Sequence, residues 1–388
     1  MTEDERAINT HANPPSGGLT DLMHASPRQA PVTLCLMACN IGVFIAMLAY
    51  GAGLWHTSNG VQLAWGANFG PATQDGQWWR LGSAMFLHFG VVHLALNMWA
   101  LWDVGRLMEQ LLGRWRFLLL YLASGVFGNL LSLVVQGNRA VSGGASGAVF
   151  ALYGALLVFL WRERRQVDRG EFRWLFGAAL VFTVVALLMG QVVTGIDNAA
   201  HVGGLIAGAL LARVLAQPWV AHSPRSHGGR WLAAALLVSG IGVLLVRLPE
   251  PSYRVGDELR AREAIRQFLS DDQRISQRWG SLIDAGRRDP MSFEQLAGQI
   301  DADVTSDYQE SFEQLSALSL DSAAPSAKTL EILRRYAALR GEASHALAEG
   351  LRAKDADKVR QALEDARRAP ALAAGARAPA SAASSRAQ

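Results

Sequence analysis

Three polar motifs stand inside otherwise apolar segments of this chain. Their polar residues are Ser146 in "VSGGASGAVFALYGALLVFLW", His93 and Asn97 in "HFGVVHLALNMWALW", and His201 in "NAAHVGGLIAGAL". A neutral histidine beside a serine can take the hydroxyl proton and return it to a leaving amine, so Ser146 and His201 could be a nucleophile and its general base. The Asn97 amide, the His93 ring and the serine backbone N–H could stabilise an oxyanion.

The elements that must hold these residues are predicted to be membrane helices. Of the 388 residues, 51% are hydrophobic and 18% are charged, and the apolar residues gather between positions 32 and 247. Seven runs there have about the length that crosses ~30 Å of hydrocarbon at ~1.5 Å per residue. They are 32–51, 91–108, 117–136, 146–161, 174–193, 198–216 and 231–247. This composition excludes an ordinary soluble enzyme.

The polar residues of the three motifs are predicted to share one depth in the membrane. Each is followed by an arginine at the end of its run, in the pairs His93 and Arg106, Ser146 and Arg162, and His201 and Arg213. At ~1.5 Å per residue, all three lie roughly 18 to 24 Å from the edge that these arginines mark. Scattered polar residues would not agree in this way, so the sequence predicts a single buried site.

Arginine placement gives an orientation. Clusters follow the second, fourth and sixth runs: Arg106, Arg114 and Arg116; Arg162, Arg164, Arg165, Arg169 and Arg173; and Arg213, Arg225 and Arg230. The positive-inside rule puts these ends, and the N-terminus, in the cytoplasm, and seven spans would leave the C-terminal region outside. The net charge of +3 indicates no nucleic-acid partner, because the arginines serve membrane topology.

Helical spacing places small and polar residues on shared faces. His93 and Asn97 are i and i+4, and two further stripes follow the same pattern: Ser146, Phe150 and Gly154, and His201, Gly204 and Gly208. Small residues let two membrane helices approach closely, so Gly154 facing Gly204 and Gly208 would bring His201 toward Ser146. The alternative is that these glycines serve packing alone.

The motifs resemble those of the rhomboid family of intramembrane serine proteases. "GGASGAVFAL", "HLALN" and "HVGGLIAG" are similar to its serine, His-x-x-x-Asn and His-x-x-Gly-x-x-x-Gly motifs. "WWR" at 78–80 resembles its Trp-Arg element in the long first external loop, and "GRLMEQLLG", with Glu109, resembles the segment that closes its second helix. The resemblance covers residues 32–216 and implies a six-helix core.

The resemblance also implies an activity: hydrolysis of peptide bonds in or near transmembrane segments of other membrane proteins, without metal or cofactor. It makes Ser146 the nucleophile, His201 the base, and His93 and Asn97 the oxyanion donors. Supporting positions that match are Gly144, Gly147, Phe150, Gly154, Gly204, Gly208, Trp79, Arg80 and Glu109. The implied substrate helix enters between the second and fifth helices, and the implied location is the bacterial inner membrane. The family dyad has no third acid, so Asp197 receives no catalytic role.

The expected domain organisation has five parts. They are a flexible cytoplasmic segment 1–31, the core 32–216, a loop and seventh transmembrane helix 217–247, a helical extramembrane region 248–368 and a disordered Ala-rich tail 369–388. In the helical region, apolar residues recur at helical spacing, at Ile265, Phe268, Ile275, Trp279 and Leu282 and at Leu333, Tyr336, Leu339, Leu347 and Leu351. The partner of this region, if it recruits one, is not indicated.

Other classes of membrane protein fit the motifs less well. A catalytically inactive rhomboid-like protein that binds membrane clients would lack the dyad or the oxyanion donors, yet all are present. A transporter would often show repeated halves, and no such repeat is evident in the sequence. A membrane metalloprotease or aspartyl protease would need His-Glu-x-x-His or Gly-x-Gly-Asp, and neither motif is present. Cys35 and Cys39 lack further metal ligands nearby and are predicted to be small buried hydrophobes.

Overall fold

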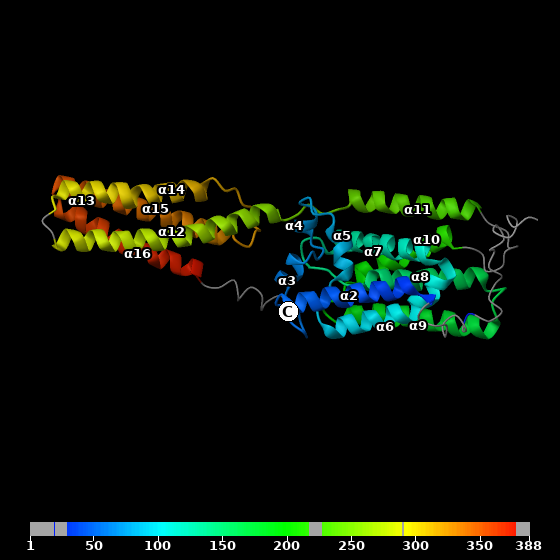
Figure 1. Cartoon of the computed structure of the whole chain (residues 1–388). Helices are drawn as coiled ribbons and strands as arrows, with labels where there is room; N and C mark the ends of the chain where they lie inside the picture. The colour runs from blue at the N-terminus through cyan, green and yellow to red at the C-terminus, as the bar shows by residue number, and fades with distance from the viewer. Residues whose placement is uncertain (1–18, 20–28, 217–226, 289–290, 378–388) are drawn as a thin grey trace, which may run out of the picture. The chain divides into compact units, whose positions relative to one another are not determined.

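The computed structural model describes residue 19 and residues 29–216, 227–288 and 291–377 (Figure 1). Within these ranges every regular element is a helix, and one isolated antiparallel bridge pairs Asn68 with Ser142. The chain divides into two compact units, Met1–Pro251 and Ser252–Gln388, called here the N-terminal unit and the C-terminal unit. The predicted all-α fold class is confirmed.

Seven long helices make up most of the N-terminal unit. They are α2 (Pro31–Ala49), α6 (Val91–Leu112), α7 (Arg114–Gln136), α8 (Ser146–Glu163), α9 (Arg169–Val192), α10 (Asn198–Leu215) and α11 (His227–Val246). Six are long and apolar enough to cross a membrane by themselves. The exception, α6, qualifies when joined to the preceding segment Arg80–Phe86, from which it is bent by 93°. The polytopic architecture predicted from the seven apolar runs is therefore confirmed.

Helix α8 lies at the centre of this unit and packs most closely against α10 (Figure 1). Glycines allow that approach. A Cβ on Gly204 would overlap the Gly147 carbonyl oxygen, and one on Gly208 would overlap the Ala151 carbonyl. Gly154 packs against Leu205, and not against Gly204 and Gly208 as the stripe pattern predicted. The two helices are thus offset so that Gly154, Gly204 and Gly208 each face the backbone of the other helix, and of these three Gly204 meets a glycine, Gly147.

Short helices fill the segment between α2 and α6. They are α3 (Asn59–Ala64), α4 (Gly70–Thr73), α5 (Arg80–Ser83) and η3 (Ala84–Phe86). Two side-chain hydrogen bonds join this segment to α7: the Asn68 amide donates to the Asn129 carbonyl at 2.9 Å, and the Asn129 amide donates to the Leu81 carbonyl at 2.7 Å. The segment is therefore fastened to α7.

Helix α11 runs back toward the end of the unit from which α8 starts. Near its beginning, Arg230 donates to the Val214 carbonyl at the end of α10 at 2.6 Å. Beyond its end, the carbonyl of Glu250 accepts a hydrogen bond of 2.9 Å from the amide of Asn138, in the loop before α8. A helix with these two contacts crosses the full height of the unit, as a seventh span would.

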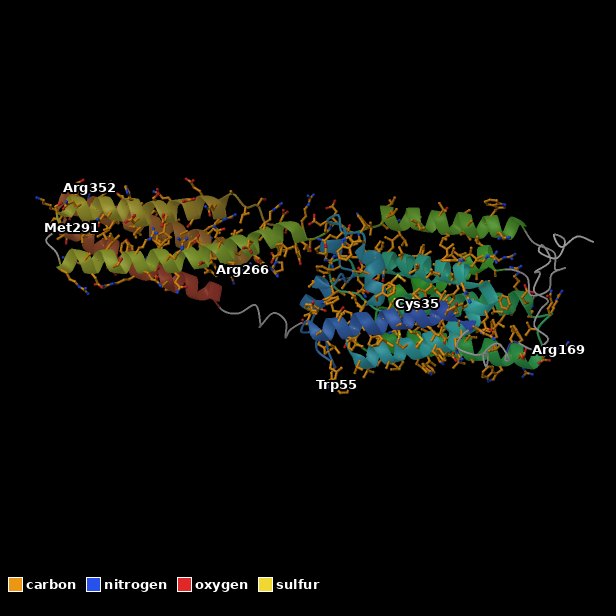
Figure 2. All side chains as sticks on the ribbon, in the orientation of Figure 1. Cys35, Trp55, Arg169, Arg266, Met291 and Arg352 are labelled. Carbon is orange, nitrogen blue, oxygen red and sulfur yellow. The ribbon has the colours of Figure 1, made fainter. Side chains whose placement is uncertain are left out.

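The C-terminal unit is a bundle of helices with charged outer faces (Figure 2). Its elements are α12 (Val255–Arg288), α13 (Phe293–Ile300), the π-helical turn η4 (Asp301–Thr305), α14 (Ser306–Ser316), α15 (Ala327–Ala353) and α16 (Ala356–Arg377). Its core contains predicted positions from both apolar series, among them Phe268, Ile275 and Leu333. The predicted helical character of this region is confirmed.

Two segments depart from expectation or fall outside the described residues. Helix α16 continues to Arg377 through Pro370, so part of the tail predicted to be disordered from 369 onward is helical. The remainder, 378–388, lies outside the described residues, as do 217–226 and nearly all of the predicted flexible segment 1–31.

Cys35 and Cys39 lie on the exposed side of α2, where Figure 2 labels Cys35. The prediction that they are buried is wrong. In a helix surrounded by hydrocarbon, a small apolar side chain gains little by facing the protein interior, because lipid tails are equally apolar. The inward face of α2 instead carries Asn40, whose amide donates to the Leu36 carbonyl at 2.7 Å.

Candidate active site

Ser146 and His201 meet between α8 and α10. The Ser146 hydroxyl oxygen lies 2.8 Å from Nε2 of His201, within hydrogen-bond distance. Ser146 is the first residue of α8, and His201 lies in the first turn of α10. The close packing of these two helices therefore brings together two residues that are 55 positions apart in the chain.

Phe150 fixes the plane of the His201 ring. It follows Ser146 by one helical turn, and its ring stacks on the imidazole with centroids 4.2 Å apart and planes 7° apart. His201 is 6% exposed. A ring held on its face and buried at its edge has few other rotamers to adopt, so the 2.8 Å contact to Ser146 is a pre-organised one.

The loop 137–145, called here the serine loop, precedes Ser146 and lies against His93. Gly144 has φ +144°, a conformation that side chains disfavour, and a Cβ there would sit 2.9 Å from Cε1 and 3.0 Å from Nε2 of His93. The Phe89 N–H points at Nδ1 of His93 over a long 3.5 Å hydrogen bond. A neutral ring that accepts at Nδ1 carries its proton on Nε2, the nitrogen that faces the serine loop.

Asn97 lies one turn after His93 on α6 and is buried. Its amide nitrogen donates to the His93 carbonyl at 2.9 Å. An amide nitrogen carries two hydrogens, so this bond uses one and leaves the second for another acceptor.

Three of the predicted supporting residues, Glu109, Arg80 and Trp79, hold the scaffold of the N-terminal unit. Glu109 accepts from the backbone of Val32 at 2.9 Å and of Thr33 at 2.7 Å, which ties α6 to the start of α2. Arg80 donates to the carbonyls of Leu63 in α3 and of Ala67 just after α3. The Trp79 ring, 56% exposed as a residue, lies 4.9 Å from the Arg80 guanidinium. Within the described residues, no group of three His, Cys, Asp or Glu could hold a metal.

Known proteins are similar in sequence to the part of the chain that contains this candidate site. A sequence model of the Rhomboid domain matches residues 75–218. The putative rhomboid protease YdcA of Bacillus subtilis is 33% identical over 192 residues, which cover 49% of this chain and 91% of that protein. The rhomboid protease GlpG of Yersinia pestis is 35% identical over 213 residues, covering 53% of this chain and 70% of GlpG. The chain belongs to the rhomboid family.

A third rhomboid relative is longer than the shared region. The rhomboid protease GluP of Bacillus subtilis is 37% identical over 199 residues, which are 51% of this chain but only 37% of GluP. The relatives are named as proteases, and the N-terminal unit with its apolar helices is that of an integral, multi-pass membrane protein. The matches to YdcA, GlpG and GluP span roughly half of this chain.

Sequence reasoning gave no role to two further polar residues of the N-terminal unit, Asp197 and His88. Asp197 accepts hydrogen bonds from the Ser132 and Ser142 hydroxyls and from the Ala200 N–H. His88 is fully buried, and its ring lies edge-on to His93 with centroids 5.2 Å apart. Asp197 had one local signal, an acidic residue just before a helix, which is an N-cap pattern. Its two serine partners are far away in the sequence and gave none.

Proposed function

We propose that this protein is an intramembrane serine endopeptidase, with Ser146 as nucleophile and His201 as general base. The 2.8 Å contact between the Ser146 hydroxyl and His201 Nε2 carries the proposal. Serine needs an adjacent base to react, and a buried, stacked imidazole at hydrogen-bond distance is such a base. The names of the relatives, rhomboid proteases, agree with this chemistry.

The reaction runs in two halves. Ser146 Oγ attacks the scissile carbonyl carbon as its proton passes to His201, and the resulting imidazolium then protonates the leaving amine as the C–N bond breaks. The product of this half is an ester on Ser146. A water molecule attacks that ester, His201 takes the water proton, and the serine regains its hydrogen as the acid product leaves.

Donors around the serine would stabilise the oxyanion of each tetrahedral intermediate. The backbone N–H of Ser146 is one of the unsatisfied donors at the first turn of α8. The His93 Nε2–H and the second hydrogen of the Asn97 amide are the others. Each such donor contributes on the order of 10²-fold in rate when it is well aimed.

The substrates are proposed to be transmembrane segments of other proteins, reaching the dyad between α6 and α9. Helix α9 buries few of its residues, and its Phe182 contacts the site. The Phe182 ring lies 6.3 Å from Phe150, 4.2 Å from Tyr153 and, across to α6, 6.1 Å from Trp99, measured between centroids. Outward movement of α9 would open a path from lipid to His201, and a substrate helix must unwind there to expose its peptide bond.

The orientation is proposed from the arginine clusters, with the N-terminus in the cytoplasm of a bacterial cell and the serine nearer the outer face of the inner membrane. Because α11 ends on the side of the unit where α8 begins, the chain from Ser252 onward would leave the membrane at the outer face. Labelling of single cysteines introduced at exposed positions of the C-terminal unit, in intact cells and in inverted vesicles, tests this directly.

The test of the activity uses the purified full chain in lipid vesicles with a single-span model substrate. Wild type, Ser146→Ala and His201→Ala are compared, and the masses of the fragments locate the cut. We expect cleavage by wild type only, unchanged by a metal chelator. Folded wild type that cleaves none of several substrates, yet binds them, would favour a client-binding protein instead.

A further inference from the structure

Two contacts with identical spacing join the serine loop to α10. The Ser146 hydroxyl meets His201, and four residues earlier on both segments the Ser142 hydroxyl donates to Oδ2 of Asp197 at 2.5 Å. Both pairs are 55 residues apart in the chain. The second contact therefore lies beside the first and joins the same two stretches of backbone.

Asp197 binds more than Ser142. Its Oδ2 also accepts from the Ser132 hydroxyl of α7, and its Oδ1 accepts from the Ala200 N–H at 3.0 Å, which makes it the N-cap of α10. One carboxyl group thus joins α7, the serine loop and the start of the helix that carries the histidine. An ordinary N-cap needs only the last of these contacts.

The serine loop has little freedom at Ser142. Its backbone N–H donates to the Asn68 carbonyl and its carbonyl accepts from the Asn68 N–H, each at 2.9 Å. Two residues on, the Gly144 N–H donates to the Ala84 carbonyl at 2.8 Å. The backbone of the loop is thus held by Asn68 and Ala84, and the Ser142 side chain links the loop to α10 through Asp197.

We propose that Asp197 is a positioning residue that sets the register of the serine loop against α10 and so fixes the Ser146–His201 distance. This inference rests on the proposed protease function. Asp197 does not act as a third catalytic residue, because its Oδ1 is bonded to the Ala200 N–H and no described residue is hydrogen-bonded to Nδ1 of His201. It acts through the backbone of both segments.

The hydrogen bonds that each substitution removes predict the order of the effects on kcat. Asp197→Ala removes the anchor for all three donors, whereas Asp197→Asn keeps one oxygen and replaces the other with a donor. Ser142→Ala removes the hydrogen bond between the serine loop and Asp197, and Ser132→Ala removes only the hydrogen bond between α7 and Asp197. The turnover number is expected to fall most for Asp197→Ala, less for Ser142→Ala and least for Ser132→Ala. A misplacement of about 1 Å can cost on the order of 10²-fold in rate.

The experiment measures kcat and KM for a single-span substrate in vesicles, together with the rate at which a fluorophosphonate labels Ser146. For Asp197→Ala we expect kcat and the labelling rate to fall together by about 10- to 100-fold, with KM within about twofold. The matched control is Asp168→Ala. Asp168 is the N-cap of α9 and accepts from the N–H groups of Gly170 and Glu171, and within the described residues no serine is hydrogen-bonded to it.

A double-mutant cycle on Ser142 and Asp197 distinguishes a positioning effect from a general loss of stability. If Asp197 acts through Ser142, the double variant Ser142→Ala/Asp197→Ala should lose little more kcat than Asp197→Ala alone. Should Asp197→Ala fail to fold, Ser142→Ala and Ser132→Ala carry the same test through kcat and labelling. An unchanged kcat in these variants, or an equal loss in Asp168→Ala, would overturn the inference. Wild type that neither cleaves nor labels would refute the protease proposal itself.

Discussion

The C-terminal unit and the N-terminal unit both bury charged and polar side chains, but the partners of those side chains differ. In the C-terminal unit, the carboxylate of Asp272 accepts from the Tyr308 and Tyr336 hydroxyls at 2.9 and 2.7 Å. Arg340 donates to the Tyr308 oxygen at 3.1 Å and to the Ala366 carbonyl at 3.3 Å.

That last bond explains how α16 tolerates a proline. Pro370 has no N–H, so the carbonyl of Ala366, four residues before it, loses its helical partner, and the Arg340 guanidinium supplies another. The guanidinium also lies 5.0 Å from the Tyr308 ring and 5.4 Å from the Trp279 ring. The network is closed: its groups satisfy one another.

In the N-terminal unit some buried polar groups lack a hydrogen-bond partner, and two of the residues concerned, His201 and His88, belong to the candidate dyad or lie beside His93. All the buried side-chain nitrogens and oxygens that lack a partner among the described residues belong to this unit, and three are ring nitrogens of His88 and His201. A closed network stabilises one structure, whereas open donors and acceptors can bind reactants. In the C-terminal unit this buried polar network holds the fold together, whereas the N-terminal unit combines structural bonds, such as those of Glu109 and Asn129, with unpartnered groups at its candidate dyad.

The largest expected effect comes from forcing the dyad helices apart. Gly204→Ala places a methyl group on the Gly147 carbonyl, so α8 and α10 must separate; we expect a loss of more than about 3 kcal/mol in stability and no measurable cleavage. Thermal unfolding and the vesicle assay measure both. The matched control is Gly177→Ala on α9, where a Cβ meets nothing within 4 Å and stability should be unchanged or higher. Equal behaviour of the two variants would contradict the packing argument.

The second-largest effect should come from weakening the hydrogen-bond network around Asp272. Asp272→Asn weakens both phenol hydrogen bonds, because the two hydroxyls share Oδ1 of Asp272 and the amide oxygen that replaces it carries no charge. We expect a loss of about 2 kcal/mol confined to residues 252–377. Hydrogen exchange of the full chain, resolved by peptide, measures it. The exposed Asp303 offers a control, since Asp303→Asn should change little. If Asp272→Asn were as well protected as wild type, the network would not be what holds this unit together.

A smaller effect should follow from loosening the dyad without changing its chemistry. Phe150→Leu keeps the volume but removes the flat face under His201, and we expect kcat to fall about tenfold with stability changed by less than about 1.5 kcal/mol. Phe150→Tyr retains the ring and should stay close to wild type. A kcat for Phe150→Leu equal to that of wild type would show that stacking does not position His201.

The smallest effect concerns pH in the C-terminal unit. Burial raises the pKa of Tyr308 and of Tyr336 above the ordinary value of about 10. Because the folded unit holds these protons more tightly than the unfolded chain, their contribution is complete below about pH 10 and is lost as pH rises beyond it.

Pulse proteolysis of the full chain in urea should therefore show residues 252–377 losing stability as the pH rises above about 10. Tyr336→Phe should cost about 1 kcal/mol at pH 8 and show a shallower decline. A wild-type stability that is flat over this range would argue against the buried phenols as essential donors.

Local sequence patterns predicted much of this fold. The seven apolar runs predicted the long helices, because a membrane span needs a fixed length of apolar residues and little else. The i, i+4 spacing of Ser146 and Phe150 and the shared depth of the motifs predicted a common site, and the structure brings Ser146, Phe150 and His201 together. Their catalytic roles stay predictions.

What the sequence could not predict depends on contacts between distant segments. The Ser132 and Ser142 partners of Asp197 lie 65 and 55 residues away, so its N-cap pattern alone gave no sign that it joins α7, the serine loop and α10. The offset that sets Gly154 against Leu205 is a matter of helix crossing rather than of spacing. The helical stretch around Pro370 requires Arg340 from another helix.

The most direct test of the central claim is to map where a fluorophosphonate reacts with the folded protein in vesicles, by mass spectrometry of its peptides. We predict one adduct per chain, on Ser146, with labelling slowed roughly a thousandfold or more in His201→Ala and absent after heat denaturation. An adduct on another serine, or labelling of Ser146 that does not depend on His201, would contradict the account.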